Sequence, residues 1–215
     1  MPCVSKKMEA VLPDMYSAGA GADVDIVLTT REFARLVRAE HIAPALLTEE
    51  AFDSPLGEST GAGVIFGVTG GVMEAALRTA YYCVEGVNPP PDTFSDVRGF
   101  EAGGSFLTLG GKKLRTCTVS GLKNARDLME DIRSGAVHYD FVEVMACPGG
   151  CVGGGGQPIL DGVEMADVRG PKLYKLDSQR PLRFSHDNPE IIKLYEEYLE
   201  KPLGEKSHHL LHTHG

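Results

Sequence analysis

Residues 113–145, "KLRTCTVSGLKNARDLMEDIRSGAVHYDFVEVM", decide the fold, because they describe two strands with a helix between them. The first nine residues are rich in β-branched side chains and predict a strand, and 139–145 predict a second one. Between them, 122–134 form an amphipathic helix with Gly135 as its C-cap. The side chains expected to face inward are Leu122, Leu128, Met129 and Ile132. Two strands joined by a helix are parallel with a right-handed crossover, so we expect an α/β fold.

A pair of cysteines follows the second strand. Cys147 and Cys151 stand in "CPGGC", and four glycines, 153–156, come directly after them. Ligands bind at the carboxyl ends of strands in open parallel sheets, and thiolates are the ligands of iron-sulfur clusters. We expect these glycines, with Gly149 and Gly150, to make room for a large inorganic ligand. A zinc site would accept the same thiolates but usually takes two such pairs, and two buried thiols in a glycine-rich turn are the remaining alternative.

The flanking segments complete the predicted layout. A strand is expected at 24–28, turning into a helix through a capping box of Thr29 and Glu32. That helix is expected to bury three apolar side chains, Phe33, Leu36 and Val37. We predict a long loop over 53–71, a helix from residue 72 that stops at Gly86, and a turn-rich stretch to about residue 111. Beyond residue 158 an extended, basic stretch is expected, and then a helix with Pro189 in its first turn.

Composition limits the class of function. The chain has 215 residues and a formal net charge of −9, which argues against nucleic acid or an anionic membrane as partner. It has neither an apolar run of about 18 residues nor a signal peptide, so a cytoplasmic location is expected. Two of the five cysteines, Cys83 in a predicted helix and Cys117 in a predicted strand, are expected to be core thiols.

Two motifs carry a resemblance to a known family. "MPCVSKKMEA" at 1–10 and "MACPGGCVGGGGQP" at 145–158 resemble the second and third signature motifs of the iron-only (FeFe) hydrogenase catalytic domain. Further similar stretches are "FGVTGGVMEAALRT" at 66–79, residues 119–145, and "SHHLLHTH" at 207–214. The resemblance covers residues 1–215 as part of that domain, with a small-subunit-like tail from about 189 to 215. It implies parallel-sheet lobes with flanking helices around a central cluster-binding cleft.

The resemblance also implies a cofactor and its ligands. The family binds the H-cluster, a four-iron cubane joined to a two-iron subsite with carbon monoxide, cyanide and dithiolate ligands. By position the cubane ligands would be Cys3, Cys147 and Cys151. Cys151 would also bridge to the two-iron subsite, and Lys6 would donate a hydrogen bond to a cyanide, so these two are the expected catalytic residues. The residues expected to surround the cofactor are Met1, Pro2, Lys6, Phe66 and Met145.

One part of the family pattern is not in this sequence. The first motif, which supplies the fourth cubane cysteine and a proton-passing cysteine, belongs upstream of Met1, so we interpret the chain as the C-terminal portion of a longer hydrogenase. The expected reaction is reversible reduction of protons to dihydrogen. Expected partners are ferredoxin or a nicotinamide-linked electron-transfer subunit, together with maturation proteins.

Other functions stay open. A non-catalytic hydrogenase-like iron-sulfur protein, of the cluster-assembly or prelamin-recognition type, has similar cysteine motifs, and a hydrogen sensor would have the same pocket. His208 and His212, four residues apart, have the spacing of helical metal ligands. We favour packing of the tail for them, because the family has a similar tail.

Overall fold

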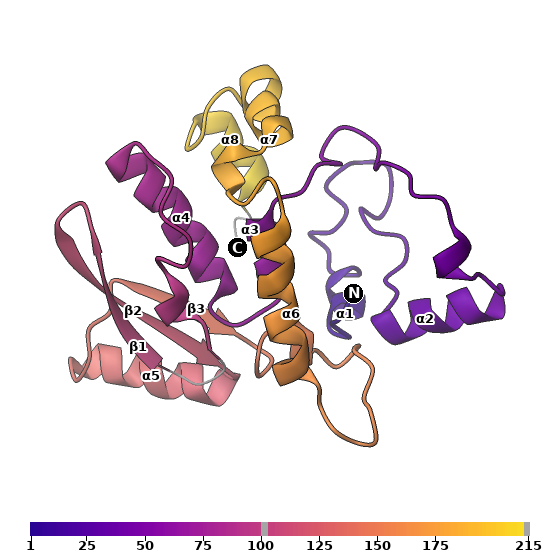
Figure 1. Cartoon of the computed structure of the whole chain (residues 1–215), viewed down its shortest axis with the longest axis horizontal. Coiled ribbons are helices and arrows are strands. Elements are labelled where there is room, and N and C mark those ends of the chain that lie inside the picture. Colours follow the sequence, from indigo (N-terminus) through magenta and orange to yellow (C-terminus); the bar gives the residue numbers. More distant parts are fainter. Residues whose placement is uncertain (100–102, 213–215) are drawn as a thin grey trace.

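The computed structural model describes residues 1–99 and 103–212, and in them one three-stranded sheet with helices on both sides forms the larger lobe (Figure 1). The sheet has the order β1-β2-β3, with β1 Gly103–Leu109, β2 Lys112–Ser120 and β3 Phe141–Met145. β2 and β3 are parallel, and α5, Leu122–Ser134, connects them. The predicted strand–helix–strand unit and the α/β class are therefore confirmed, as is the C-cap Gly135, whose φ is +76°.

The first strand was not expected from the sequence. β1 pairs antiparallel with β2 through a turn at Gly110 and Gly111, which both have positive φ. The glycines at both ends of β1 are typical of turns. The alternating residues between them were therefore not recognised as a strand. The sheet is consequently mixed, with β2 and β3 parallel as expected and β1 added antiparallel at its edge.

Helix α5 is less buried than predicted. Leu128 and Ile132 are half-buried, but Leu122 and Met129 are 74% and 46% exposed. The crossover contacts the sheet along a narrow stripe, so two of the four side chains expected to face inward lie at its margin. A cavity of about 280 Å³ between α5 and β2, lined by Cys117 and Leu128, shows how loosely this face packs.

The opposite face of the sheet holds the main core. Helix α4, Gly71–Glu85, ends at Gly86 with φ +72°, as predicted. Its Met73 and Leu77 pack with Phe94 and Val97, and Leu107 and Phe141 of the sheet lie against this cluster. The expected loop at 53–71 contains a short buried helix, α3, Gly61–Ile65, whose Thr60 cap accepts a hydrogen bond from Gly63. The loop prediction is wrong there.

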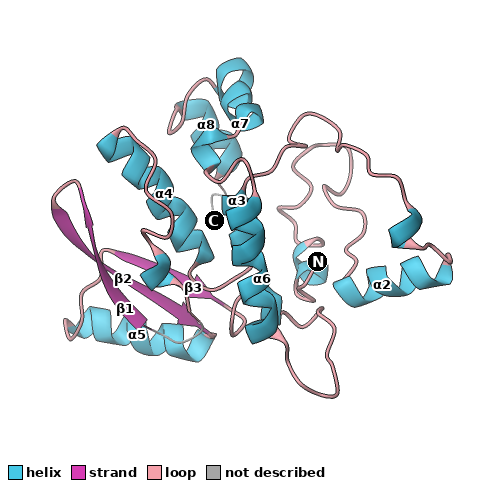
Figure 2. Cartoon of the chain, in the orientation of Figure 1, coloured by secondary structure: helices cyan, strands magenta, loops and turns pink. Residues whose placement is uncertain are grey.

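Helix α6, Ala166–Gln179, is the largest difference from the sequence expectation, which was extended chain. The pair Gly170 and Pro171 indicates a break, and Pro171 does remove one backbone hydrogen bond. α6 nevertheless stands at the centre of the molecule, between the sheet lobe and the N-terminal segment (Figure 2). It packs against α3, and this tertiary packing offsets the local preference.

The N-terminal lobe has little regular structure apart from α1, Lys6–Glu9, and α2, Thr30–Ala39. The capping box of Thr29 and Glu32 is confirmed. Residues 24–28 do not pair with a strand, so that prediction is wrong. Phe33 and Leu36 are 57% and 46% exposed and Val37 is half-buried, because nothing in the described chain covers this face of α2.

The tail begins with α7, Pro189–Leu194, capped by Asn188, which confirms the helix with Pro189 in its first turn. A π-helical turn, Tyr195–Leu199, follows, and α8, Glu205–Leu211, is the last helix described. Residues 213–215 of the tail lie outside the described residues. Single 3₁₀ turns lie at Pro44–Leu46, Ser95–Val97, Cys151–Gly153 and Ser185–Asp187. No helix among the described residues has the length and apolar character needed to cross a membrane.

Candidate functional site

Three segments that are distant in the sequence lie side by side at the candidate site. The backbone amide of Gly156 donates a hydrogen bond of 2.8 Å to the carbonyl oxygen of Pro2. The carbonyl of Met1 in turn accepts a hydrogen bond of 2.9 Å from the amide of Thr30, in the first turn of α2. The residues around Cys3 are thus held between the glycine run after Cys151 and the start of α2.

The glycines make these close approaches possible. A Cβ on Gly154 would overlap the carbonyl oxygen of Pro2, and a Cβ on Gly150 would lie 2.8 Å from the amide of Thr69. Gly150 also has φ +87°, which disfavours any other residue. The expectation that these glycines make room for an inorganic ligand is therefore wrong for Gly150 and Gly154, and also for Gly153 and Gly156, whose missing side chains admit the protein's own backbone.

The two neighbouring cysteines lie at the end of β3, as the sequence indicates. Cys147 follows the last strand residue by two positions, and its carbonyl accepts a hydrogen bond of 3.0 Å from Gly150. Cys151 begins a 3₁₀ turn that is fixed to the turn after α3 by the 3.0 Å hydrogen bond from the amide of Val152 to the carbonyl of Gly67. Cys3 and Cys147 are half-buried, and Cys151 is exposed.

The three thiols share one electrostatic environment. The pKa of Cys151 is raised, chiefly because neighbouring protein atoms limit hydration of its thiolate although part of the residue is exposed. Cys147 and Cys3 raise this pKa further, and the ammonium of Lys6 opposes them. Two thiols and a cation, from two segments that are distant in the sequence, therefore lie within electrostatic reach of Cys151.

No group of three His, Cys, Asp or Glu side chains within residues 1–99 and 103–212 could hold one metal ion. Iron-sulfur clusters differ, because each thiolate binds a different iron and the thiols need not meet at one point. Three thiols on neighbouring segments, with backbone amides and an ammonium nearby, have the chemistry of the donor set that holds and tunes such a cluster. The residues present therefore fit a cluster.

A cavity of about 630 Å³ adjoins this site. Its lining is mostly apolar and includes Met1, Lys6 and four residues of the segment 24–28. Lys6 forms an ion pair with Glu9, and both side chains are 42% exposed. Lys7 instead pairs with Glu32 at 2.9 Å. The hydrogen bonds from Thr29, together with Lys7, lower the pKa of Glu32 to about 2.

The remaining expected site residues differ in burial. Pro2 and Met145 are half-buried, whereas Phe66 and Met1 are 47% and 52% exposed. Phe66 directly precedes Gly67, which accepts the hydrogen bond from Val152. Whether these side chains surround a cofactor stays a prediction.

The other two cysteines differ from each other. Cys117 is buried between β2 and α5, which confirms the expectation of a core thiol, and burial raises its pKa. Cys83 is exposed near the end of α4, so the same expectation is wrong for it. Helical spacing did not reveal that the last turns of α4 extend beyond the core.

The tail histidines are at the surface. The imidazole rings of His208 and His212 stack with their centroids 4.8 Å apart, and both residues are exposed. Their expected packing role stays a prediction.

Arg169 of α6 was not recognised from the sequence. Its guanidinium donates to the carbonyl of Val152 at 3.0 Å and also to the carbonyl of Pro158. One side chain thereby connects both ends of the glycine run. Because α6 was expected to be extended, nothing in the sequence pattern placed this arginine opposite the run.

Glu143 of β3 is a second residue that the sequence reasoning missed. Its carboxylate is buried and accepts hydrogen bonds from the amides of Gly70 and Met73, at 2.6 and 2.7 Å. Free amides at a helix N-terminus favour a carboxylate. Glu143 therefore fixes the start of α4. Thr69, which directly precedes Gly70, donates a hydrogen bond of 3.2 Å from its amide to the carbonyl of Gly149.

A buried charge network joins α4 to α6. Arg78 donates to Asp177 and to Glu74, each at 2.7 Å, and all three side chains are at most 4% exposed. Arg183 also forms an ion pair with Asp177, and Arg98 forms one with Glu74. Burial alone would raise the pKa of Asp177, but its hydrogen bonds to Arg78 and Arg183 lower it. The spacing of Glu74 and Arg78 on one helix was the only signal for this network in the sequence.

Comparison with known families gives two matches along the chain. The family model described as "Iron only hydrogenase large subunit, C-terminal domain" matches residues 1–155. The model described as "Iron hydrogenase small subunit" matches residues 163–215, a range that begins before the expected tail at 189.

Individual proteins agree with these matches. The chain is 51% identical, over all of its length, to 37% of the NADP-reducing hydrogenase subunit HndD of Solidesulfovibrio fructosivorans. It is 32% identical, over 99% of its length, to 46% of the cytosolic iron-sulfur assembly component 3 of Rattus norvegicus. Its structure matches that of a variant of the [FeFe]-hydrogenase HydA1 from Chlamydomonas reinhardtii with a TM-score of 0.74 and 39% identity, covering 100% of this chain and 61% of that one. The chain thus spans less than half the length of these two curated relatives.

Proposed function

Since the chain belongs to the iron-only hydrogenase family, we propose that it forms the part of a hydrogenase that holds the H-cluster through Cys3, Cys147 and Cys151. The complete enzyme would reduce protons to dihydrogen reversibly. The single observation that carries this proposal is the position of the Cys3 segment beside the glycine run after Cys151, fixed by the hydrogen bond from Gly156 to Pro2.

The residues of this chain would act mainly by holding and tuning the cofactor. When bound, the H-cluster supplies the irons at which protons and electrons combine to form dihydrogen. Thiolates of Cys3, Cys147 and Cys151 would bind irons of the cubane, with Cys151 shared with the two-iron subsite. Met1, Pro2, Phe66 and Met145 would limit the access of water.

Lys6 would donate a hydrogen bond to an anionic cyanide ligand. An ammonium group has three N–H donors, so Lys6 can keep its ion pair with Glu9 and still donate toward the thiols. Its electrostatic effect on Cys151 supports a position close enough for this role. Hydrogen bonds to charged groups are about twice as strong as neutral ones, so Lys6→Ala should reduce retention of the two-iron subsite.

Partners and location follow from the relatives. The relative named as an NADP-reducing hydrogenase subunit supports a nicotinamide-linked electron-transfer subunit as partner, with ferredoxin as the alternative. Maturation proteins would be needed to insert the two-iron subsite. That both family models match one chain supports a single-chain, cytoplasmic type.

A second function is favoured by one observation. The relative named as a cytosolic iron-sulfur assembly component matches 99% of the chain, so a non-catalytic iron-sulfur role with a cubane alone is the alternative. A hydrogen sensor would have the same pocket as the enzyme and a slow turnover.

Infrared spectroscopy after maturation separates these functions. The longer protein that contains this chain would be produced with the hydrogenase maturation proteins, under exclusion of oxygen. The proposal predicts absorption bands of iron-bound carbon monoxide and cyanide, and loss of these bands in Cys151→Ala. A cubane signal without such bands would favour the assembly function, and bands with hydrogen binding but very slow turnover would favour the sensor.

A further inference from the structure

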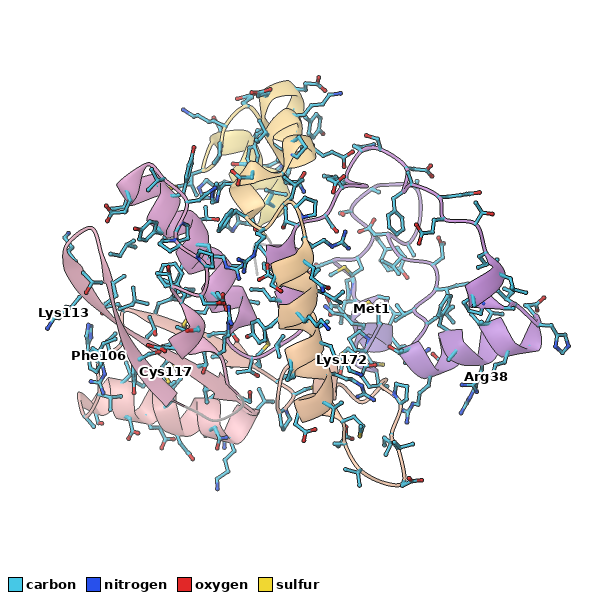
Figure 3. The ribbon with its side chains drawn as sticks, viewed as in Figure 1. Met1, Arg38, Phe106, Lys113, Cys117 and Lys172 are labelled. Carbon is cyan, nitrogen blue, oxygen red and sulfur yellow. The ribbon has the colours of Figure 1, made fainter. Side chains whose placement is uncertain are left out.

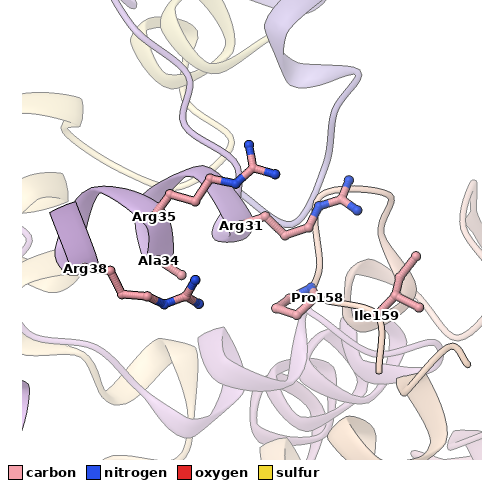
Figure 4. Close-up of a pocket in the computed structure, with 6 residues that line it drawn as sticks. All are labelled: Arg31, Ala34, Arg35, Arg38, Pro158 and Ile159. Carbon is pink, nitrogen blue, oxygen red and sulfur yellow. The ribbon is translucent and has the colours of Figure 1, made fainter. Parts of the chain in front are cut away.

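Helix α2 presents three arginines on one face. Arg31, Arg35 and Arg38 have the spacing i, i+4 and i+7, so they share one side of the helix. Figure 4 shows their side chains extending from α2 on the side where Pro158 and Ile159 lie. Together these residues and Ala34 enclose a shallow pocket of about 280 Å³.

The arginines lack acidic partners. Within the described part of the chain, no carboxylate forms an ion pair with Arg31, Arg35 or Arg38, although Asp and Glu outnumber Lys and Arg by 30 to 21. Glu32, the nearest carboxylate in sequence, is bound by Thr29 and Lys7 instead. Three unneutralised guanidinium groups on an acidic protein create a local positive field.

The arginines lie on the side of α2 that is opposite its apolar side chains. Phe33 and Leu36 lie on the opposite side of α2, where they are exposed here. If the remainder of the protein buries this apolar side, the arginines point away from it, as in any amphipathic surface helix. The basic face is then available to a partner.

The basic face also adjoins the candidate cluster site. Arg31 donates its side chain to the carbonyl of Gly155 at 2.6 Å and its amide to that of Gly156 at 3.2 Å. Gly155 and Gly156 follow Cys151, and Gly156 binds Pro2. A protein seated on α2 would therefore lie directly beside the segments that carry the thiols.

We propose that Arg35 and Arg38, with the pocket at Pro158 and Ile159, form the docking surface for an acidic electron-transfer protein. This inference rests on the proposed function, because the partner would deliver electrons to a cluster held at Cys3, Cys147 and Cys151. Arg31 anchors the surface to the glycine run. The guanidinium groups attract and orient the acidic partner, and the pocket receives one apolar side chain at the centre of the contact.

Binding to an acidic ferredoxin tests the docking surface without requiring a cluster in this chain. The full chain without metal is titrated calorimetrically with oxidised ferredoxin at low salt and at about 0.15 M salt. Arg35→Glu/Arg38→Glu should raise the dissociation constant at least about tenfold at low salt and reduce its salt dependence. Arg35→Gln/Arg38→Gln should give an intermediate loss.

A control of equal charge is available on the other lobe. Lys112→Glu/Lys113→Glu changes the net charge by the same amount on the exposed hairpin, and Figure 3 shows Lys113 and Arg38 at opposite sides of the molecule. This variant should bind ferredoxin within about twofold of the wild type at about 0.15 M salt, because its charges lie on the opposite side of the molecule from α2. Circular dichroism of each variant confirms that it is folded.

Three results would overturn the inference. They are an equal loss in both charge-reversed variants, no binding of the folded wild type at low salt, and binding of inorganic phosphate at the arginines without binding of ferredoxin. Because iron content is measured separately, failure of docking with retained cluster binding leaves the proposed function standing. Failure of cluster binding with intact docking would contradict the proposed function and leave the docking surface standing.

Discussion

The carbonyl oxygen of Pro2 and the amide of Gly156 lie 2.8 Å apart and form a hydrogen bond that spans most of the chain. Pro2 precedes Cys3, and Gly156 follows Cys151 by five positions. The bond thereby brings two cysteine motifs together, and most of the testable consequences of the structure concern the glycine run that makes it.

Gly154→Ala should disturb this contact. The added methyl group would overlap the Pro2 carbonyl, and backbone atoms cannot move aside as a flexible side chain can. Overpacking of this kind costs about 1–3 kcal/mol, and we expect a lower melting temperature together with reduced iron binding. Gly155→Ala is the matched control, because its methyl group would meet only Val4, at 3.6 Å. Equal behaviour of the two variants would contradict this packing.

Arg169→Met should loosen the glycine run while leaving α6 folded. Loss of the hydrogen bonds to Val152 and Pro158 removes the link between the two ends of the run. Hydrogen exchange followed by mass spectrometry should then show faster exchange of amides 153–157. Lys172→Met, an exposed change on the same helix, should leave that exchange as in the wild type (Figure 3). Unchanged exchange in Arg169→Met would disprove the link.

Asp177→Ala should destabilise the molecule strongly. Its carboxylate is 1% exposed and binds both Arg78 and Arg183, so its removal leaves buried positive charge without a partner. Breaking a buried pair in this way costs about 3–5 kcal/mol, measurable as the free energy of unfolding in urea. The exposed pair of Lys193 and Glu197, 3.8 Å apart, provides the comparison, and Lys193→Ala should cost less than about 1 kcal/mol. Similar losses in both variants would refute the network's role.

The same carboxylate should contribute to acid sensitivity. Its pKa is lowered in the folded state from the ordinary value of 3.8 by Arg78 and Arg183, against the effect of burial. A lowered folded pKa gives stability that is fully present above pH 3.8 and is lost as pH falls through the folded value. The stability difference between the wild type and Asp177→Asn should therefore shrink below about pH 4. Urea unfolding at several pH values measures it, and a difference that stays constant would contradict the linkage.

The sequence predicted the parts of the fold that have a local cause. The crossover of β2, α5 and β3 follows from alternating and helical apolar periods, and the cap at Thr29 follows from a side chain that binds its own helix. Such features need no knowledge of distant residues.

What the sequence did not predict depends on distant contacts. α6 forms despite Pro171 because it packs against α3, and β1 forms because β2 lies beside it. The role of Gly154 is visible only once Pro2 lies against it, and Arg169 matters only because α6 places it opposite the glycine run. The exposure of Phe33 and Cys83 likewise depends on what covers α2 and α4 in space.

Iron binding by a series of cysteine variants tests the central claim most directly. After anaerobic reconstitution with iron and sulfide, the wild type should bind about four irons per chain as one cubane, seen by iron analysis and, after reduction with dithionite, by electron paramagnetic resonance. Cys3→Ser, Cys147→Ser and Cys151→Ser should each lose most of this iron, whereas Cys83→Ser and Cys117→Ser should keep it. Full iron content in Cys3→Ser would contradict the account, because Cys3 would then not share a cluster with the pair that follows β3.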